Sequence, residues 1–261
     1  MRCTSAQFTH TGAVRDHNED AYLAFPQHGL WVVADGMGGH QAGEVASQLI
    51  CETLNSECLR YGPSLGREEL EQAFSLANQR IRQYRDQQMP GATMGSTMVA
   101  LKITEDRYQV LWIGDSRAYL LRDGELRRLS RDHSQVADLV EQGVISEEEA
   151  ENHPLSNVIT RALGVDDHPV IDCREGKVMA GDRFLVCTDG ISREFELREL
   201  QSFLSGEPID DISQALCHAA LVRGCKDNIT SVIVQVEESS TWAEPTGSAG
   251  DSTLPLGQWN M

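Results

Sequence analysis

Short runs of β-branched, aromatic and aliphatic residues recur along the chain and predict nine strands. Glycine, proline, serine, asparagine and aspartate separate many of these runs, as is typical of turns. The Asp123-Gly124 pair between two of the runs indicates a two-residue hairpin. The predicted strands cover residues 20–25, 30–34, 96–103, 107–113, 117–122, 125–129, 170–174, 183–188 and 229–236.

A helical spacing of apolar residues predicts two long helices, at 41–60 and 67–88. Shorter helices are predicted near residues 134–142, 146–152, 196–204 and 210–222. Two adjacent helices, then many strands, then further helices favour an α+β fold. A doubly wound parallel sheet is disfavoured because strict alternation of strand and helix is missing.

The composition changes after Val236, where the regular pattern ends. Residues 238–261 are rich in serine, threonine, glycine and proline, which is typical of a disordered segment. We therefore predict one domain at residues 1–237 and a disordered tail at 238–261.

Acidic residues outnumber basic ones by 40 to 22, which gives a formal net charge of −18. This charge argues against binding to nucleic acid or to an anionic membrane surface. The N-terminus has no apolar signal segment, and no run reaches the roughly 18 apolar residues of a membrane span. The seven cysteines form no C-x-x-C pair, so no zinc site is expected. Because a signal segment and a membrane span are both missing, we expect reduced thiols in a cytoplasmic protein.

Acidic residues stand at the edges of five predicted strands. They are Asp35, Asp115, Asp189, Asp227 and the adjacent pair Glu19 and Asp20. Any one of them alone is best explained as a turn former. If the strand ends converge, however, the carboxylates repel one another, and divalent cations can compensate the charge. Oxygen ligands without cysteine or clustered histidine favour Mg²⁺ or Mn²⁺. The glycine next to Asp35 leaves the Gly36 carbonyl accessible as a further ligand.

Six short motifs resemble, in order, those of the metal-dependent protein phosphatases, the protein phosphatase 2C family, in their bacterial form. The motifs are VRDHNEDAY, ADGMGGH, GSTMVA, GDSRAY, TDGI and KDNIT, and with their flanking strands they span residues 12–236. The resemblance implies a four-layer α-β-β-α sandwich, in which two mostly antiparallel sheets are flanked by helix pairs. It also implies metal ions in a channel at one end of the sandwich.

The resemblance also assigns the metal ligands, carried over position by position. Asp35 matches the carboxylate that bridges two ions, and Gly36 supplies a carbonyl to one of them. Asp189 and Asp227 complete the coordination of the first ion. Glu19 binds the second ion through a water molecule, and Asp20 supports this arrangement. Asp115, together with Asp189, matches a third and weaker site.

Two further residues match catalytic positions of the family. Arg15 resembles the arginine that grips the substrate phosphate, a role that suits its planar, bidentate fork. His40 lies in the metal-binding turn, and it could protonate the alkoxide leaving group as a general acid. A lone arginine or histidine is otherwise best explained as a surface or structural residue.

The function implied is that of a protein-serine/threonine phosphatase, which hydrolyses phosphoserine and phosphothreonine in proteins with a water activated by two metals. Such an enzyme would act in signal transduction, as a monomer, and would oppose a bacterial-type serine/threonine kinase. Residues 143–165 match the flap beside the catalytic channel. The alternatives are a catalytically silent phosphoprotein-binding scaffold on the same fold and a plain acidic cation-binding protein, which would not account for Arg15 and His40.

The tail provides a first prediction. Its composition cannot bury enough apolar surface to offset the entropy lost on ordering, although Trp242 and Trp259 could dock on the domain. Deletion of residues 238–261 should leave phosphopeptide hydrolysis and the melting temperature nearly unchanged, as measured by kinetics and thermal unfolding. A fall of several degrees in the melting temperature would show that the tail packs on the domain.

Overall fold

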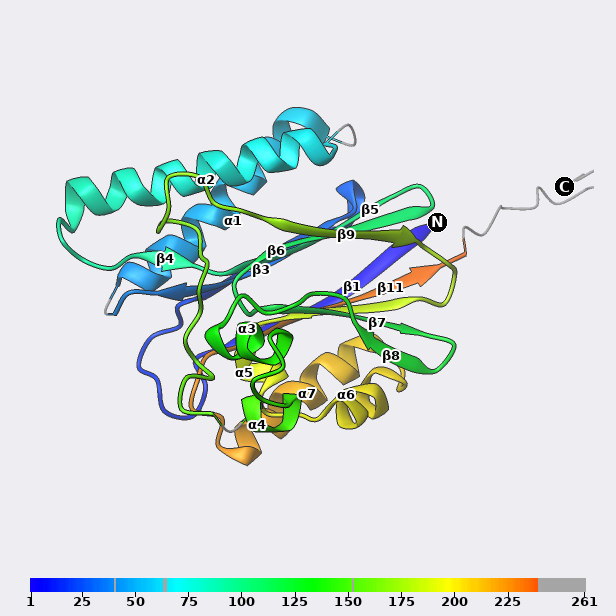
Figure 1. Ribbon diagram of the computed structural model, residues 1–261. Coiled ribbons are helices and arrows are strands. Elements are labelled where there is room, and N and C mark those ends of the chain that lie inside the picture. The colour runs from blue at the N-terminus through cyan, green and yellow to red at the C-terminus, as the bar shows by residue number, and fades with distance from the viewer. Residues whose placement is uncertain (40, 63–64, 152, 239–261) are drawn as a thin grey trace, which may run out of the picture.

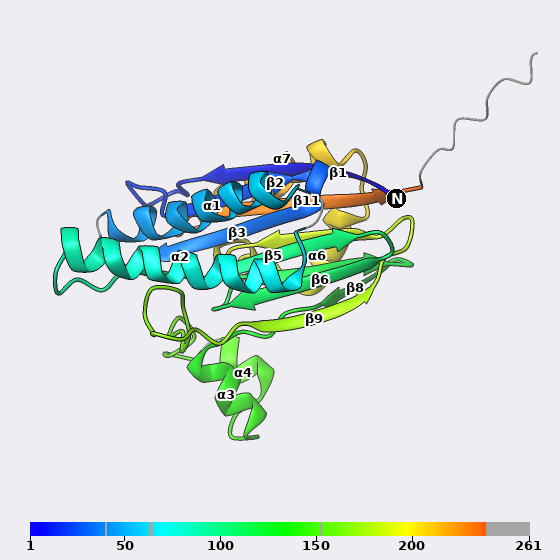
Figure 2. The ribbon, with the colours of Figure 1, turned by 90° about the horizontal axis from the view of Figure 1, so that it is seen from above.

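The computed structural model describes residues 1–39, 41–62, 65–151 and 153–238 of the chain. Two β-sheets pack face to face, one helix pair covers each outer face, and two short helices project beside the layers (Figures 1 and 2). The predicted α+β fold with four α-β-β-α layers is confirmed. The predicted tail lies outside the described residues, apart from Glu238.

Both sheets are antiparallel. The first has the order β1-β11-β10-β7-β8 and is formed by β1 (Arg2–His10), β11 (Ile229–Glu237), β10 (Arg183–Cys187), β7 (Arg117–Arg122) and β8 (Glu125–Arg128). The second has the order β2-β3-β5-β6-β9, with β4 also paired to β3. Its strands are β2 (Asp20–Phe25), β3 (Leu30–Met37), β4 (Gly95–Ser96), β5 (Met98–Thr104), β6 (Arg107–Ile113) and β9 (Asp172–Lys177).

The two long helices α1 (Ala42–Tyr61) and α2 (Arg67–Gln88) cover the second sheet. The helices α6 (Leu197–Leu204) and α7 (Ile209–Arg223) cover the first sheet. Short helical segments complete the described chain: η1 (Pro26–His28), α3 (Gln135–Glu141), α4 (Glu147–Glu151) and α5 (Asp189–Ser192). Figure 2 shows α3 and α4 projecting beside β9, away from the four layers.

The apolar run of β3 is continuous because both of its faces are buried. Leu30, Val32 and Ala34 pack in the core beneath the long helices. Trp31 and Val33 point the other way and pack in the core between the sheets. All five side chains are fully buried, which anchors the segment that leads to Asp35.

Several predicted elements agree with the structure at both ends, namely those at 20–25, 107–113, 117–122 and 67–88. Strand β1 was missed because it is an edge strand in which only Ala6 is buried, so its sequence lacks a buried apolar face. The one-turn helix α5 was also missed, and the strand predicted at 170–174 lies at Asp172–Lys177 instead.

All seven cysteines are free thiols, as predicted. In the described part of the chain, every helix is too short or too polar to cross a bilayer.

Candidate metal centre

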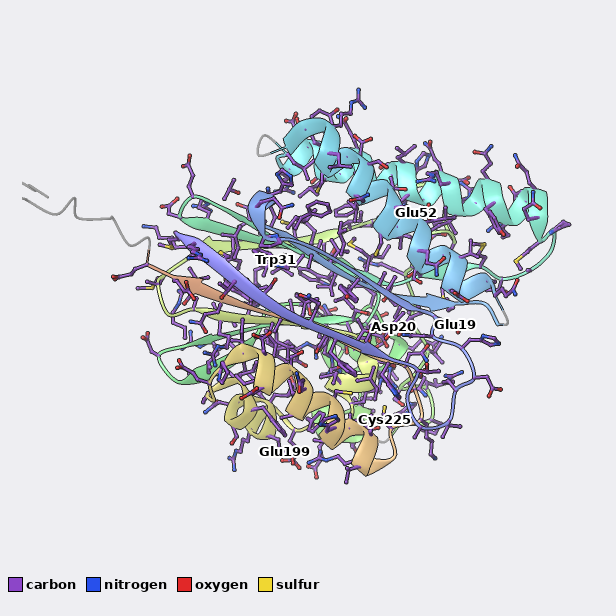
Figure 3. The ribbon with its side chains drawn as sticks, turned by 180° about the vertical axis from the view of Figure 1, so that it is seen from behind. Glu19, Asp20, Trp31, Glu52, Glu199 and Cys225 are labelled. Carbon is purple, nitrogen blue, oxygen red and sulfur yellow. The ribbon has the colours of Figure 1, made fainter. Side chains whose placement is uncertain are left out.

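The strand ends that carry acids converge at one end of the sandwich. Asp20 begins β2 and is the register partner of Asp35 near the end of β3. In the other sheet, Asp189 follows β10 and Asp227 precedes its antiparallel neighbour β11, which places both at the same edge. Asp115 lies in the turn between β6 and β7. Figure 3 shows Glu19 and Asp20 side by side at this end, far from the start of β1.

The carboxylates are close enough to raise one another's pKa. The pKa of Asp35 is raised well above its ordinary value. Burial is the largest cause, and it is followed by the carboxylates of Asp20, Asp189, Asp115 and Asp227. Burial is also the main cause that raises the pKa of Asp20 and of Asp189 to about 7. Without a cation, these acids therefore keep their protons to a higher pH than a solvated aspartate does.

Asp20 is a buried member of the predicted ligand set, with 8% of its surface exposed. Its Oδ2 accepts a hydrogen bond of 2.9 Å from Thr188 Oγ1. Its Oδ1 is buried and has no hydrogen-bond partner among the described residues. A buried carboxylate oxygen without a partner is costly, and a nearby cation would remove that cost.

Close backbone packing explains why position 36 is a glycine more fully than the need for an accessible carbonyl does. A Cβ on Gly36 would lie 2.0 Å from the carbonyl oxygen of Gly43, in the first turn of α1. A Cβ on Gly43 would in turn lie 2.8 Å from Cδ of Glu19. The Gly36 amide also donates a hydrogen bond of 3.0 Å to the Glu19 carbonyl. The two glycines therefore bring β3, α1 and the Glu19 loop into direct contact.

Two hydroxyl residues that were not predicted as site residues hold Asp35 in place. The Asp35 amide donates to Thr97 Oγ1 at 3.2 Å, and the Thr97 amide donates to the Asp35 carbonyl at 2.8 Å. Ser96 Oγ donates to the same carbonyl at 2.9 Å. The GSTMVA motif thus fixes the backbone of Asp35 from the neighbouring strands.

Asn228 fixes the opposite side of the site and was also missed. Its Oδ1 accepts a hydrogen bond of 2.8 Å from the Glu19 amide. Its Nδ2 donates to the carbonyls of Thr11 and His17, each at 2.9 Å. A polar residue between Asp227 and an apolar strand was the available signal, since such a residue is buried with the strand and needs partners.

Arg15 lies at the rim of the site, in the loop between β1 and β2. Its Nη2 is 3.1 Å from Oδ2 and 3.0 Å from Oδ1 of Asp227, while 52% of its side chain is exposed. The hydrogen bond to Asp227 is the main cause that raises the pKa of Arg15. The structure therefore places Arg15, the residue predicted to bind phosphate, beside the acidic residues. His40 lies outside the described residues.

An unpredicted arginine contacts two of the acids. Arg193 Nη2 is 2.8 Å from Asp115 Oδ2, and Arg193 Nε is 3.0 Å from Asp189 Oδ2. The only sequence signal for this contact is the four-residue spacing from Asp189, which places the two side chains on one helical face. Arg193, Asp189 and Asp227 also line a groove of about 370 Å³ beside the acids, together with Arg223 and Lys226.

The donor set fits a hard divalent cation by its chemistry. It consists of buried, mutually repelling carboxylates, and one buried oxygen, Asp20 Oδ1, lacks a partner. In the ranges that the structure describes, no three Asp, Glu, His or Cys side chains are already arranged as they would be around one ion. The side chains would therefore rotate towards an ion on binding. Oxygen-only donors of this kind select Mg²⁺ or Mn²⁺.

Comparison with known proteins agrees with the fold, which is that of the metal-dependent protein phosphatases. Residues 10–233 match the family described as protein phosphatase 2C. The chain is 34% identical to the serine/threonine phosphatase Stp of Listeria monocytogenes, over 87% of this chain and 93% of that protein. It is 38% identical to the phosphatase PstP of Mycobacterium tuberculosis, over 86% of this chain and 43% of that protein.

Solved structures give the same result. The crystal structure of Mycobacterium tuberculosis PstP superposes with a TM-score of 0.82 at 35% identity, and the match covers 91% of this chain and 100% of that one. PppA, a regulatory component of the Pseudomonas aeruginosa T6SS, gives a TM-score of 0.80 at 38% identity, with 90% and 98% covered. The chain belongs to the protein phosphatase 2C family. The predicted enzyme class, a protein-serine/threonine phosphatase, is confirmed with it.

The raised pKa values of Asp20 and Asp189 lead to a prediction about the metal-free protein. An unfolded aspartate has a pKa near 4, so between about pH 4 and pH 7 the folded protein binds more protons than the unfolded chain. The free energy of unfolding should therefore fall as the pH rises from about 4 to about 7, and level off above that, when a chelator is present. Saturating Mn²⁺ should weaken this pH dependence, because a bound ion stabilises the ionised form of the aspartates.

Thermal unfolding at several pH values, with chelator and with Mn²⁺, measures the effect. The matched control is Asp189→Asn in chelator. This variant lacks one of the two titrating carboxyl groups, so the slope of its unfolding free energy against pH should be smaller. Equal slopes in the metal-free and metal-loaded wild-type protein would contradict the assignment of these acids to the metal centre.

Proposed function

We propose that this chain hydrolyses phosphoserine and phosphothreonine in proteins, with a water molecule activated by two divalent cations. One observation carries the proposal: five aspartates from both sheets converge at one end of a protein phosphatase 2C fold. Their mutual repulsion needs cations, and the adjacent groove leaves room for a substrate.

The proposed ligands of the two ions are Asp35, the Gly36 carbonyl, Asp189 and Asp227, with Glu19 acting through water and Asp20 in support. When bound, two Mg²⁺ or Mn²⁺ ions would lower the pKa of a water between them and clamp the phosphoryl group for in-line attack. The catalytic domain of a phosphatase PstP, 34% identical to this chain, has been solved with two manganese ions, which supports the pair. Asp115 would share a third, weaker ion with Asp189.

The chain's own residues position these ligands. Thr97 and Ser96 hold the Asp35 backbone, and Asn228 holds the Glu19 amide. The contact of Gly36 with Gly43 keeps the first turn of α1 against the site. Because all these groups are fixed by strands or by buried hydrogen bonds, their geometry would be set before a substrate arrives.

Arg15 would orient the substrate. Both of its contacts with Asp227 use Nη2, and half of its side chain is exposed. Among the described residues, its Nε and Nη1 make no hydrogen bond to protein, so they could donate to two oxygens of a phosphoryl group. Lysine could not replace it, because an ammonium group lacks the planar fork.

His40 would donate a proton to the leaving group. In the sequence it lies between the residues of β3 and those of α1, four residues after Gly36. A serine or threonine alkoxide is a poor leaving group, so protonation as the bond to phosphorus breaks would accelerate the reaction.

The physiological setting follows from this chemistry. Substrates would be proteins phosphorylated on serine or threonine, and the enzyme would act in signal transduction against a bacterial-type kinase. We propose a monomer in the cytoplasm. The flap at residues 143–165 would influence substrate choice from beside the groove, since Asn157 lines it. A silent phosphoprotein-binding scaffold is the alternative.

Metal dependence is the direct test. The purified protein should hydrolyse p-nitrophenyl phosphate and phosphothreonine peptides with Mn²⁺ or Mg²⁺, and excess chelator should abolish turnover. Asp35→Asn should lower kcat/KM at least about a hundredfold while the fold is retained, because one charged group at the reacting centre is lost. Circular dichroism checks the fold, and Asp86→Asn on the outer helix α2 is the matched control.

The outcomes distinguish the proposals. Equal turnover in excess chelator would exclude the two-metal mechanism. A folded wild-type protein that binds phosphopeptides with Mn²⁺ but never turns them over would favour the silent scaffold.

A second test separates the role of His40 from a structural one. His40→Ala should slow hydrolysis of phosphoserine peptides by roughly a hundredfold or more, the usual contribution of a general acid. Hydrolysis of p-nitrophenyl phosphate should change far less, because p-nitrophenolate leaves without a proton. Steady-state kinetics with both substrates measures the difference, and His218→Ala on α7 is the control. The same loss with both substrates would make His40 a structural or metal-shell residue.

A further inference from the structure

Arg193 occupies a central position that neither the predicted metal ligands nor Arg15 and His40 explain. Its guanidinium reaches Asp115 through Nη2 at 2.8 Å and Asp189 through Nε at 3.0 Å. The two carboxylates come from different segments, one between β6 and β7 and the other at the start of α5. One positively charged group therefore joins the same two acids that would share the outer ion.

The contact is largely enclosed and is fixed by the backbone. The exposed fractions of the side chains are 7% for Asp115, 17% for Asp189 and 30% for Arg193. The Arg193 amide donates a hydrogen bond of 2.9 Å to the Asp189 carbonyl, so the single turn of α5 places the arginine beside Asp189. Charge-assisted hydrogen bonds in such a partly buried place are stronger than those at an open surface.

A second arginine near Asp115 and Asp189 is committed elsewhere. Arg117 donates to both carboxylate oxygens of Asp132, with its shortest contact at 2.8 Å. It also donates to the Ser192 carbonyl at 3.3 Å, directly before Arg193. Arg117 therefore supports the backbone, while Arg193 makes the direct contacts with the two acids.

Arg193 also reaches the flap. Its Nη2 donates a hydrogen bond of 3.1 Å to the carbonyl of Ser156, within the segment 153–158. This contact joins the flap to the acids through a single guanidinium. A displacement of Arg193 from Asp115 would therefore remove one anchor of the flap.

We propose that Arg193 is a built-in competitor of the outer cation, so that ion binding between Asp115 and Asp189 displaces its guanidinium and releases the flap at Ser156. A divalent ion and a guanidinium bound to the same two carboxylates would repel each other within a few ångströms. Only one of them can therefore be favoured at a time. The inference rests on the proposed outer site, and it makes Arg193 a positioning residue that links metal occupancy to the flap.

Metal titration is the first arm of the test. Calorimetric titration with Mn²⁺ should show that Arg193→Ala binds the outer ion about tenfold more tightly than the wild-type protein. The Mn²⁺ affinity of Arg193→Lys should lie between those of Arg193→Ala and the wild type, because lysine retains the charge but cannot bridge both carboxylates. Arg223→Ala is the matched control, since Arg223 lines the same groove but pairs with Glu199. Adding Asp115→Asn to Arg193→Ala should abolish the gain.

Hydrogen exchange is the second arm. Its first comparison uses metal-free protein, so that comparison depends neither on turnover nor on the outer ion. Backbone amides of residues 153–157 should exchange faster in Arg193→Ala than in the wild type, and Arg223→Ala should behave like the wild type. In the wild type, exchange of these amides should also rise as Mn²⁺ fills the outer site.

Specific results would overturn the proposal. Unchanged Mn²⁺ affinity in Arg193→Ala, or a gain that survives Asp115→Asn, would exclude competition for this site. Unchanged exchange at residues 153–157 would exclude the link to the flap. If Arg193→Ala fails to fold, Arg193→Lys serves in both arms, and wild-type values for that variant would count against the proposal. Loss of phosphatase activity alone would bear on the proposed function and not on this inference.

Discussion

Repulsion between buried carboxylates is the constraint on which the rest of this structure depends. Five aspartates are held at one end of the sandwich, where burial and then the other four carboxylates raise the pKa of Asp35 well above its usual value. Such a cluster persists only if the surrounding chain holds it rigidly. The buried strand β3, the contact between Gly36 and Gly43, and the hydrogen bonds of Thr97 and Asn228 together provide that rigidity.

The acidic residues could be predicted from the sequence, but the residues that hold them in place could not. Asp35 could be found because a run buried on both faces ends at an acid, and both properties are local. Thr97, Asn228 and Arg193 make their contacts with residues 35, 19 and 115, which lie far away along the chain. No periodicity or spacing encodes such contacts. Strand β1 was missed for a related reason, since its pairing with β11 joins the two ends of the domain.

The site combines features of the family with features of this chain. The match of residues 10–233 places the chain in the protein phosphatase 2C family, and the acidic motifs lie within that range. The two contacts of Arg193 with the acids are an observation on this chain, and no motif that we recognised requires them. A shared set of ligands can thus be surrounded by residues that tune when and how strongly each ion binds.

The pairing of β1 with β11 has a geometric consequence for engineering. Arg2 lies opposite Glu237 in the register, while His10 lies opposite Ile229, two residues after Asp227. Figure 1 shows the N-terminus beside the end of β11. Neighbouring strands are about 5 Å apart, so the two ends of the domain almost touch, at the pole of the sandwich farthest from the acids. A short peptide could join them into a closed ring, and the chain could then be reopened at an exposed loop. A reporter attached at that pole would stand clear of the groove where a phosphoprotein would bind.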